Sequence, residues 1–276
     1  MKEGEVVMFV YKINAAMTVA AIKMIYQATA FDKDLTVPRL ATMLAHIPLT
    51  VSAWQGKQLI GFARYLTDFE YSAYLSDLAV LPAYQRQGIG RHLLKIGCDY
   101  LGCRVTIALR AAPTAKTYYP QVGFTACDHL FRLPRAIQLP VNKLPSITVT
   151  AQAKISGQQL AQIFQAAGLR RPVHDLGRLQ RMLNNATFIY TAWQGTELVG
   201  IARGFTDGAY VGYIADLAVA KSFQRQGIGR QLLAQIRRDL GPQISLLLLA
   251  ASEAMTYYPQ LSFQQDANGF TQLRQW

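Results

Sequence analysis

The chain has 276 residues, of which 51% are hydrophobic and 16% charged, and its formal net charge at pH 7 is +12. This length favours about two domains, and no apolar run is long enough to cross a bilayer. The positive charge raises the question of nucleic acid, but no cluster of Lys and Arg with interleaved aromatic residues is present, so we expect neither a nucleic-acid nor a membrane partner.

The first elements alternate between strand and helix patterns. We expect a strand at residues 6–12, helices at 15–29 and 37–46, and two strands at 49–54 and 58–66. A tight turn containing glycine joins the last two strands, which indicates a hairpin.

The remaining elements of the first half follow a strand that ends in a glycine-containing corner. We expect that strand at residues 74–81, and a helix after the corner. Then come a buried strand at 104–110, a short helix at 114–121 and final strands at 124–127 and 129–133.

The second half repeats the first. Trp54-Gln-Gly, Asp77 and Tyr118-Tyr-Pro-Gln all return 139 residues later with no insertion between them. A repeat of this length, seen twice, indicates duplicated domains rather than a solenoid. The second-half elements are expected at residues 147–151, 156–167, 176–185, 244–249 and 253–260.

A proline-containing segment separates the copies. Pro134, Pro140 and Pro145 favour extended chain without helix. We therefore predict domains at residues 1–135 and 147–276, joined by a linker at 136–146. Each domain reads as a mixed α/β sheet with helices on both faces.

The glycine-containing corner is suited to bind a phosphate group. The first N–H groups of a helix have no intrahelical partner and carry the positive end of its dipole, so they attract anions. Glycine lets a ligand approach the backbone, and arginine suits phosphate oxygens. The corner residues are Gln85, Arg86, Gln87, Gly88, Ile89, Gly90 and Arg91, with counterparts Gln224, Arg225, Gln226, Gly227, Ile228, Gly229 and Arg230. The other reading is a tightly packed corner without a ligand.

The pattern Gln-x-x-Gly-x-Gly between a strand and a helix closely resembles the acetyl-CoA motif of the GNAT superfamily of N-acetyltransferases. The resemblance extends through nearly all of each half and implies two tandem GNAT domains that use acetyl-CoA. It also implies a β-bulge before the corner, which splays that strand from the next one and frees its backbone groups. The strand residues that would contact the pantetheine and the thioester oxygen are Leu78, Ala79 and Val80, with counterparts Leu217, Ala218 and Val219. From sequence alone this is an ordinary apolar strand.

A tyrosine after the corner helix fits the family pattern Tyr-x-x-x-Gly-Phe. The resemblance implies that Tyr119, and Tyr258 in the second half, is the general acid that protonates the leaving thiolate. A phenol with a pKa of ~10 remains protonated at neutral pH and can serve this role. The alternative is a tyrosine that only packs on the sheet, and we expect Tyr118 and Tyr257 to be packing residues of that kind.

The general base stays open at this point. An acceptor amine must lose a proton to attack, and Asp77 and Asp216 are candidates because they stand next to the implied bulge in both copies. They could equally cap or brace a turn, and a chain of water molecules could carry the proton instead. Tyr74 and Tyr213, on the same strands, could line the acceptor pocket.

The two copies differ most in the loop between their first two helices. Residues 31–36 lean acidic and residues 170–175 lean basic, in a region that the resemblance places at the acceptor site. Lys221 and Ser262 also replace Pro82 and Gly123. The first copy is therefore the closer fit to the family, and we expect the pair to mimic a GNAT dimer within one chain.

These observations predict an acetyl-CoA-dependent N-acetyltransferase that acts on a primary amine of a small molecule or peptide, without a metal. The alternative is a regulatory protein that binds CoA, with one or both sites catalytically silent. The start of the chain has no signal-peptide pattern, and Cys98, Cys103 and Cys127 lack Cys-x-x-Cys spacing. We therefore expect reduced thiols and a cytoplasmic location.

Overall fold

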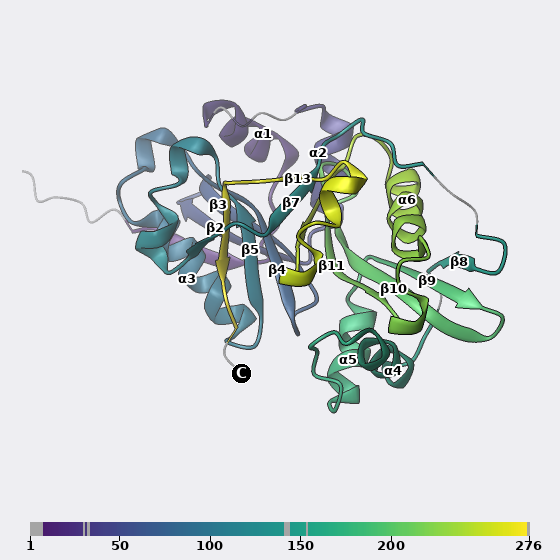
Figure 1. Cartoon of the computed structure of the whole chain (residues 1–276). Helices are drawn as coiled ribbons and strands as arrows, with labels where there is room; N and C mark the ends of the chain where they lie inside the picture. Colours follow the sequence, from purple (N-terminus) through teal and green to yellow (C-terminus); the bar gives the residue numbers. More distant parts are fainter. Residues whose placement is uncertain (1–7, 30, 32–33, 141–143, 153, 275–276) are drawn as a thin grey trace, which may run out of the picture.

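The structure is a computed structural model that describes residues 8–29, 31, 34–140, 144–152 and 154–274. Two mixed α/β halves follow each other along the chain (Figure 1). The first half contains, in order, β1 (Val10–Ile13), α1 (Val19–Ala28), α2 (Val37–Ala45), β2 (Leu49–Gln55), β3 (Gln58–Thr67), β4 (Ser72–Val80), η1 (Pro82–Tyr84), α3 (Ile89–Leu101), β5 (Thr106–Arg110), η2 (Pro113–Ala115), η3 (Tyr119–Val122), β6 (Thr125–Cys127) and β7 (Leu130–Leu133).

The second half repeats this order. It contains β8 (Thr148–Ala151), α4 (Gly157–Ala167), α5 (Leu176–Asn184), β9 (Phe188–Gln194), β10 (Glu197–Thr206), β11 (Val211–Val219), η4 (Lys221–Phe223), α6 (Ile228–Leu240), β12 (Ser245–Leu249), η5 (Ser252–Ala254), η6 (Tyr258–Leu261), β13 (Gln264–Gln265) and β14 (Gly269–Gln272). Among the described residues, no helix is both long and apolar enough to span a bilayer.

Most predicted elements are present with small shifts at their ends. The helix predicted at 114–121 is instead a pair of short 3-10 helices, η2 and η3, and each begins at or next to a proline. Pro120 has no N–H to donate and disfavours the helical conformation of the residue before it, so one continuous α-helix cannot form. The predicted first strand begins in residues that are not described, and β1 covers its end.

The two seven-stranded sheets exchange their last strands. One sheet has the order β1-β2-β3-β4-β5-β14-β6, and the other has β13-β7-β12-β11-β10-β9-β8. Thus β14, from the end of the chain, lies between β5 and β6 of the first half, and Figure 1 shows this yellow strand among the blue ones. Reciprocally, β7 pairs with β12 and β13 of the second half. Neither sheet is complete without a strand from the other half.

Helices cover both faces of the first sheet, so each residue of β4 can be assigned to the face on the α1–α2 side or to the face on the α3 side. Ala79 packs in a cluster with Ile22 and Ile25 of α1, whereas Leu78 and Val80 pack against the cluster under α3. Successive residues of a strand point to opposite faces, so Asp77 shares the α1–α2 side with Ala79. The strand thus separates two environments, one on each face.

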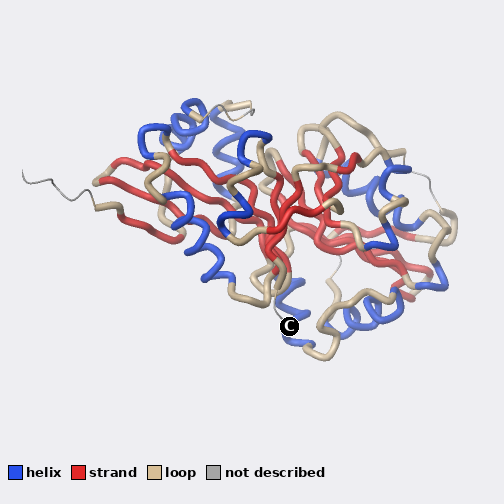
Figure 2. Tube along the Cα trace, turned by 60° about the vertical axis from the view of Figure 1, so that its left-hand side comes forward, coloured by secondary structure: helices blue, strands red, loops and turns tan. Residues whose placement is uncertain are grey.

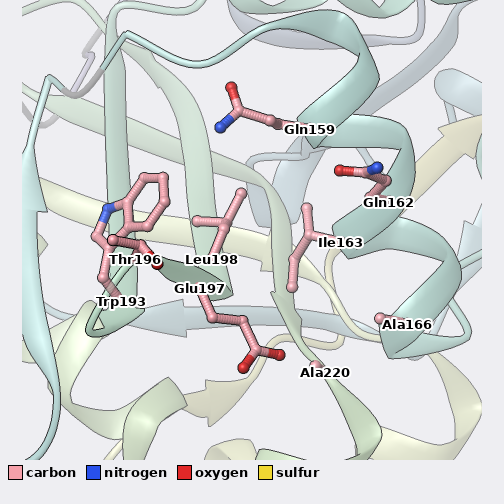
Figure 3. A pocket seen from close by; sticks show the side chains of 9 residues that line it. All are labelled: Gln159, Gln162, Ile163, Ala166, Trp193, Thr196, Glu197, Leu198 and Ala220. Carbon is pink, nitrogen blue, oxygen red and sulfur yellow. The ribbon is translucent and has the colours of Figure 1, made fainter.

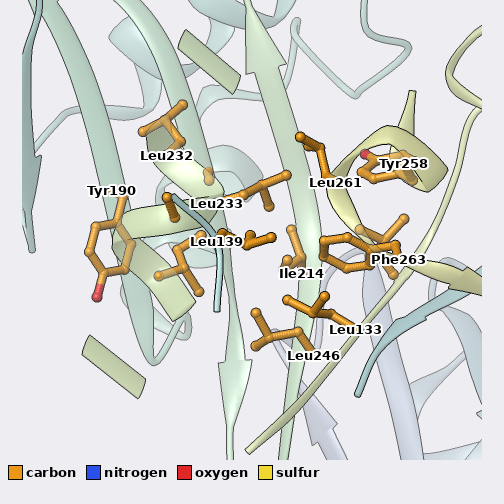
Figure 4. Packing of buried hydrophobic residues seen from close by; sticks show 14 of the residues in the cluster. Leu133, Leu139, Tyr190, Ile214, Leu232, Leu233, Leu246, Tyr258, Leu261 and Phe263 are labelled. Carbon is orange, nitrogen blue, oxygen red and sulfur yellow. The ribbon is translucent and has the colours of Figure 1, made fainter. Parts of the chain in front are cut away.

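The segment predicted as a linker also contributes to packing in its described part. Leu139 is 7% exposed and lies with Leu133 of β7 against Ile214 and Leu246 of the second half (Figure 4). The Ala136 amide donates to the Pro242 carbonyl at 2.8 Å. Burial of two leucines from before residue 147 means that the second core incorporates chain on both sides of the predicted boundary.

The sheets meet at the centre of the molecule, where the β3–β4 and β10–β11 hairpins reach into the opposite half (Figure 2). Tyr71, at the tip of the first hairpin, belongs to a core cluster with Leu160 and Phe164 of α4. Tyr210, at the tip of the second, packs with Ile25 and Phe62 of the first half. The two halves therefore pair within one chain, in agreement with the expected intramolecular pairing.

Candidate active site

A β-bulge interrupts β4 at Ser76. Arg64 of β3 lies opposite Asp77, and the next residue of β3 lies opposite Leu75, so Ser76 is the extra residue. The parallel pairing of β4 with β5 runs from Ser72 to Leu75 and ends there. The bulge and the splay that the family resemblance implied are confirmed, because the backbone beyond the bulge faces β5 without ladder pairing.

The second half repeats this geometry. The register shift falls between Arg203 and its neighbour, so that Ala215 is the extra residue of β11. Pairing of β11 with β12 ends at Ile214. The backbone freed in this way is that of Leu78, Ala79 and Val80 in β4, and of Leu217, Ala218 and Val219 in β11.

The glycine corner after β4 presents exposed backbone at the start of α3. Gly88 is the N-cap residue, with φ of 79°, and no side chain caps the first turn. Arg86 also has a positive φ, 61°, and residues 85–88 are exposed. In the second half, Arg225 has φ of 60° and the N-cap Gly227 has φ of 89°. Left-handed residues next to a helix N-terminus form a concavity of N–H donors that suits an anion.

The glutamines of the corner brace it from within. The Gln85 side chain donates to the Val80 carbonyl at 2.9 Å, and the Gln87 side chain donates to the Ala83 carbonyl at 3.2 Å. Gln224 and Gln226 make the matching bonds in the second half. Their amide groups hold the loop against the end of the strand, while Arg86 is exposed.

The second glycine of the motif has a packing role that the sequence did not reveal. A Cβ atom on Gly90 would lie 2.9 Å from the Tyr118 hydroxyl, and one on Gly229 would lie 2.7 Å from the Tyr257 hydroxyl. Contacts this short require the neighbour to move. Gly90 and Gly229 therefore leave space for a tyrosine hydroxyl, and the Tyr118 hydroxyl is buried against the first turn of α3 without a hydrogen-bond partner.

Tyr119 is buried in an aromatic cluster that spans both halves. Its ring contacts Phe124 at 5.8 Å and Phe270 of the exchanged β14 at 5.5 Å, measured between ring centroids. Tyr258 likewise contacts Phe131 of the exchanged β7 at 5.6 Å. Burial raises the pKa of the Tyr119 phenol above its usual value, and the neighbouring Tyr118 and Asp77 raise it further, so the hydroxyl is protonated at neutral pH.

Asp77 is held in a buried ion pair. The Arg64 Nε atom donates to its carboxylate at 2.5 Å, and Arg64 is 1% exposed. The same guanidinium lies 3.4 Å from the carboxylate of Asp207, at the tip of the opposite hairpin. The carboxylate of Asp77 is therefore held in place by an arginine that also reaches the other half.

Asp216 has two arginine partners. It pairs with Arg203 of β10, and Arg171 reaches it from the loop before α5 at 2.6 Å. Burial by itself would raise the pKa of Asp216, but Arg171 and Arg203 outweigh burial and hold the pKa below its usual value. Arg203 in turn pairs with Asp68 of the first hairpin tip at 2.8 Å.

Tyr74 and Tyr213 lie against each other between the halves. Their rings stack on each other at 5.2 Å with 16° between the planes, where β4 and β11 meet. Each is 4% exposed. They form part of the contact between the halves.

The loops between the first two helices of each half can be compared only in part, because residues 32–33 are not described. In the second half, Arg171 contacts Asp216 and lies over the ring of Tyr71 at 4.5 Å. By the repeat of 139 residues its counterpart is Asp32, which is outside the described residues. The basic second loop is thus directed at the bulge of its own half.

Sequence reasoning missed the charged residues of the hairpin tips. Asp68 and Asp207, and likewise Arg64 and Arg203, recur at the repeat distance, and all four side chains are essentially buried. An arginine recurring inside an otherwise apolar strand was the available signal, because a buried charge needs a partner.

Two pockets lie outside the splayed strands. One of about 340 Å³ separates α4 from the β9–β10 hairpin, and Figure 3 shows Gln162 and Ile163 facing Trp193 and Glu197 across it. The other, of about 400 Å³, follows α3 from Arg91 and is lined largely by side chains of that helix. Of the predicted cofactor residues, only Arg91 lines either pocket. The described part of the chain has no cluster of three or more His, Cys, Asp or Glu suited to a metal.

Comparison with known proteins gives a consistent family. Residues 18–132 and 154–272 each match the family model of the acetyltransferase (GNAT) domain. The uncharacterized N-acetyltransferase ycf52 of Pyropia yezoensis is 27% identical over 130 residues, which cover 45% of this chain and 73% of that protein. GCN5-related N-acetyltransferase 2, chloroplastic, of Arabidopsis thaliana is 33% identical over 81 residues, and the match spans 28% of this chain and 30% of that protein.

Solved structures share the whole architecture. A tandem GNAT protein from the clavulanic acid biosynthesis pathway covers 96% of this chain and 98% of its own, with a TM-score of 0.56 and 15% identity. A GCN5-related N-acetyltransferase from Sphaerobacter thermophilus covers 95% and 94%, with a TM-score of 0.56 and 17% identity. At these identities the likeness is one of fold alone.

Proposed function

The chain belongs to the GNAT family of acetyltransferases, with two domains in tandem, and from this we propose that it transfers an acetyl group from acetyl-CoA to a primary amine of a small molecule or peptide. The observation that carries the proposal is the repeated combination of a bulged, splayed strand and an exposed glycine corner. Family membership supports the class of reaction, and the two corners support the proposed positions of the cofactor.

The corners fit the diphosphate of acetyl-CoA. The first turn of α3 has no side-chain cap, so its N–H groups are available to an anion, and Arg86 and Arg91 are exposed beside it. Arg225 and Arg230 stand at the matching positions of α6. The backbone of Leu78, Ala79 and Val80, unpaired toward β5, would bind the pantetheine arm and the thioester oxygen.

The remaining groups handle protons and alignment. When bound, acetyl-CoA supplies the activated acetyl group. Tyr119 would donate its phenolic proton to the departing sulfur, and its aromatic neighbours fix the orientation of its ring. For Asp77 and Asp216 we favour the bracing role over the base, because each carboxylate is already paired with a buried arginine, and the arginine partners of Asp216 hold its pKa below the usual value.

Calorimetric titration with acetyl-CoA tests the two corners separately. We expect two equivalents to bind the wild type. Gly88→Asp and Gly227→Asp each put a carboxylate at a helix N-terminus, where it competes for the N–H groups and repels the diphosphate. Aspartate tolerates a left-handed conformation better than most residues, which limits the damage to the fold.

Each single variant should retain one equivalent and lose the other by roughly tenfold or more in affinity, which corresponds to about 1.4 kcal/mol. The double variant should lose both. Unchanged stoichiometry in all three proteins would exclude the corners as the binding sites. A thiol-release assay with a panel of amines then separates an enzyme from a protein that only binds the cofactor.

A further inference from the structure

We propose that the aspartates at the two hairpin tips, Asp68 and Asp207, are positioning residues that each hold the β-bulge of the opposite half. The inference rests on the proposed function in one respect, namely that the bulged strand is where acetyl transfer takes place. The connection between the two halves rests only on the contacts described below and does not depend on the proposed function.

The first tip acts on the second bulge through an arginine. Asp68 binds the Arg203 guanidinium at 2.8 Å, and that guanidinium pairs with Asp216, the residue directly after the bulged Ala215. The side chains of all three charged residues are 0% exposed. Ion pairs that are this well shielded from water are screened little by salt, so the charge of Asp68 affects the ion pair between Arg203 and Asp216 next to the bulge.

A second arginine reinforces this connection. The Tyr71 hydroxyl, also on the first tip, accepts a hydrogen bond from Arg171 at 3.1 Å, and it donates to the Arg170 carbonyl at 2.9 Å. Arg171 in turn binds Asp216 at 2.6 Å and the carbonyl of the bulged Ala215 at 3.4 Å. The bulge of the second half is therefore held by two arginines, and the first half contacts both.

The reverse connection also exists. Asp207 lies 3.4 Å from the Arg64 guanidinium, which binds Asp77, the residue after the bulged Ser76. The Tyr210 hydroxyl of the same tip donates to the Asp34 carbonyl in the loop before α2. The crossed arrangement is thus reciprocal.

The tip aspartates divide their two oxygens between the halves. One oxygen of Asp68 accepts the amides of Glu70, Tyr71 and Ser72 within its own hairpin, and the other faces Arg203. Asp207 has the same division, with its own-hairpin amides from residues 209–211. An Asp→Asn change can therefore keep the turn and remove only the charge that faces the other half.

Hydrogen exchange of the intact chain, measured by mass spectrometry, tests whether each tip aspartate holds the bulged strand of the opposite half, and it does not require activity. Asp68→Asn should speed exchange in β11 roughly tenfold while β4 changes less. Asp207→Asn is the matched control and should show the reverse pattern. Equal effects on both strands, or a larger effect on the strand of the same half, would overturn the proposal.

Kinetics provide the second readout, in proteins where one candidate acid is removed. Asp68→Asn added to Tyr119→Phe should lower the remaining turnover roughly tenfold or more, and lower it far less when added to Tyr258→Phe, because small displacements of a reacting strand cost rate steeply. Losses of the same size in the two backgrounds would overturn the proposal. If no amine is turned over by any of these proteins, the proposed function fails. The hydrogen-exchange pattern then still shows whether each tip aspartate holds the bulge of the opposite half.

A milder pair of variants covers the case in which the aspartate changes prevent folding. Tyr71→Phe removes the hydroxyl that binds Arg171, which in turn binds Asp216, and the ring remains to fill the opposite core. Exchange in β11 should again be faster than in β4, with a smaller amplitude than in Asp68→Asn, and unchanged exchange in β11 would count against the proposal. Tyr210→Phe, which removes the hydroxyl bound to the Asp34 carbonyl, is the control and should not speed exchange in β11.

Discussion

The two halves agree closely where the cofactor is expected and differ where the acceptor is expected. Both have the bulge, the uncapped helix start, the corner glutamines bonded to the strand end and the buried tyrosine. On the α1–α2 side, in contrast, Asp77 is paired with Arg64, whereas Asp216 is paired with Arg203 and Arg171. The two copies thus share the described features of the corner and the strand, and Arg171 comes from the loop in which their sequences differ most.

The largest expected effect distinguishes the halves by their candidate acids. Tyr119→Phe should lower turnover at the first site by roughly 10²-fold or more, because proton donation to the leaving sulfur is lost, while acetyl-CoA affinity stays within about twofold. Tyr258→Phe is the matched variant and should affect only acceptors used by the second site. Steady-state kinetics with calorimetry measure both quantities. If the two variants lowered the turnover of every acceptor by the same factor, the two sites would not differ in their acceptors.

A smaller effect sharpens the difference between the two aspartates. Asp216→Asn should lower the free energy of unfolding at pH 7 by about 3 kcal/mol, because two arginines lose a buried anion. The pKa of Asp216 is lowered from 3.8 in the folded protein, so its contribution is complete above that pH and disappears as the pH falls through the folded pKa.

The gap between wild type and Asp216→Asn should therefore shrink below about pH 4, as measured by denaturant titrations across the acid range. Arg171→Ala should reproduce part of the loss at pH 7, since it removes one of the two partners. A gap that stays constant across this pH range would show that the pKa of Asp216 is the same in the folded and the unfolded protein.

The smallest effect concerns the turn after each acid. Gly123 has φ of 90°, and Ser262 keeps the left-handed conformation with φ of 60° although it has a side chain. Ser262→Gly should raise the free energy of unfolding by about 1 kcal/mol, and Gly123→Ser should lower it by at least as much. Thermal melting of the two variants gives the comparison, and a stabilised Gly123→Ser would contradict it.

Local patterns predicted the elements and the corners well, because they depend on neighbours in sequence. The glycine corner, the Gln55–Gln58 hairpin and the strand that carries Leu78 lie where the sequence placed them. The bulge at Ser76 required the family resemblance, since an apolar strand reads the same with or without an extra residue.

The exchange of strands could not be read from the sequence. The strand Leu130–Leu133 is equally apolar whichever sheet it joins, and strand patterns specify a face rather than a partner. The same limit applies to Asp77: its position next to the bulge was clear, but its partner Arg64 and the contact of Arg64 with Asp207 depend on how the halves dock. The recurring arginine indicates that a partner exists, but no local pattern identifies a partner more than a hundred residues away.

The position of β14 has a consequence for how the protein is made. The first sheet needs residues 269–272 between β5 and β6, and these are synthesised after all the other strands of both sheets. Domains usually fold in order during synthesis, with the N-terminal one first. Here the earlier-made sheet must wait, with a gap between β5 and β6, until β14 of the second half has been synthesised.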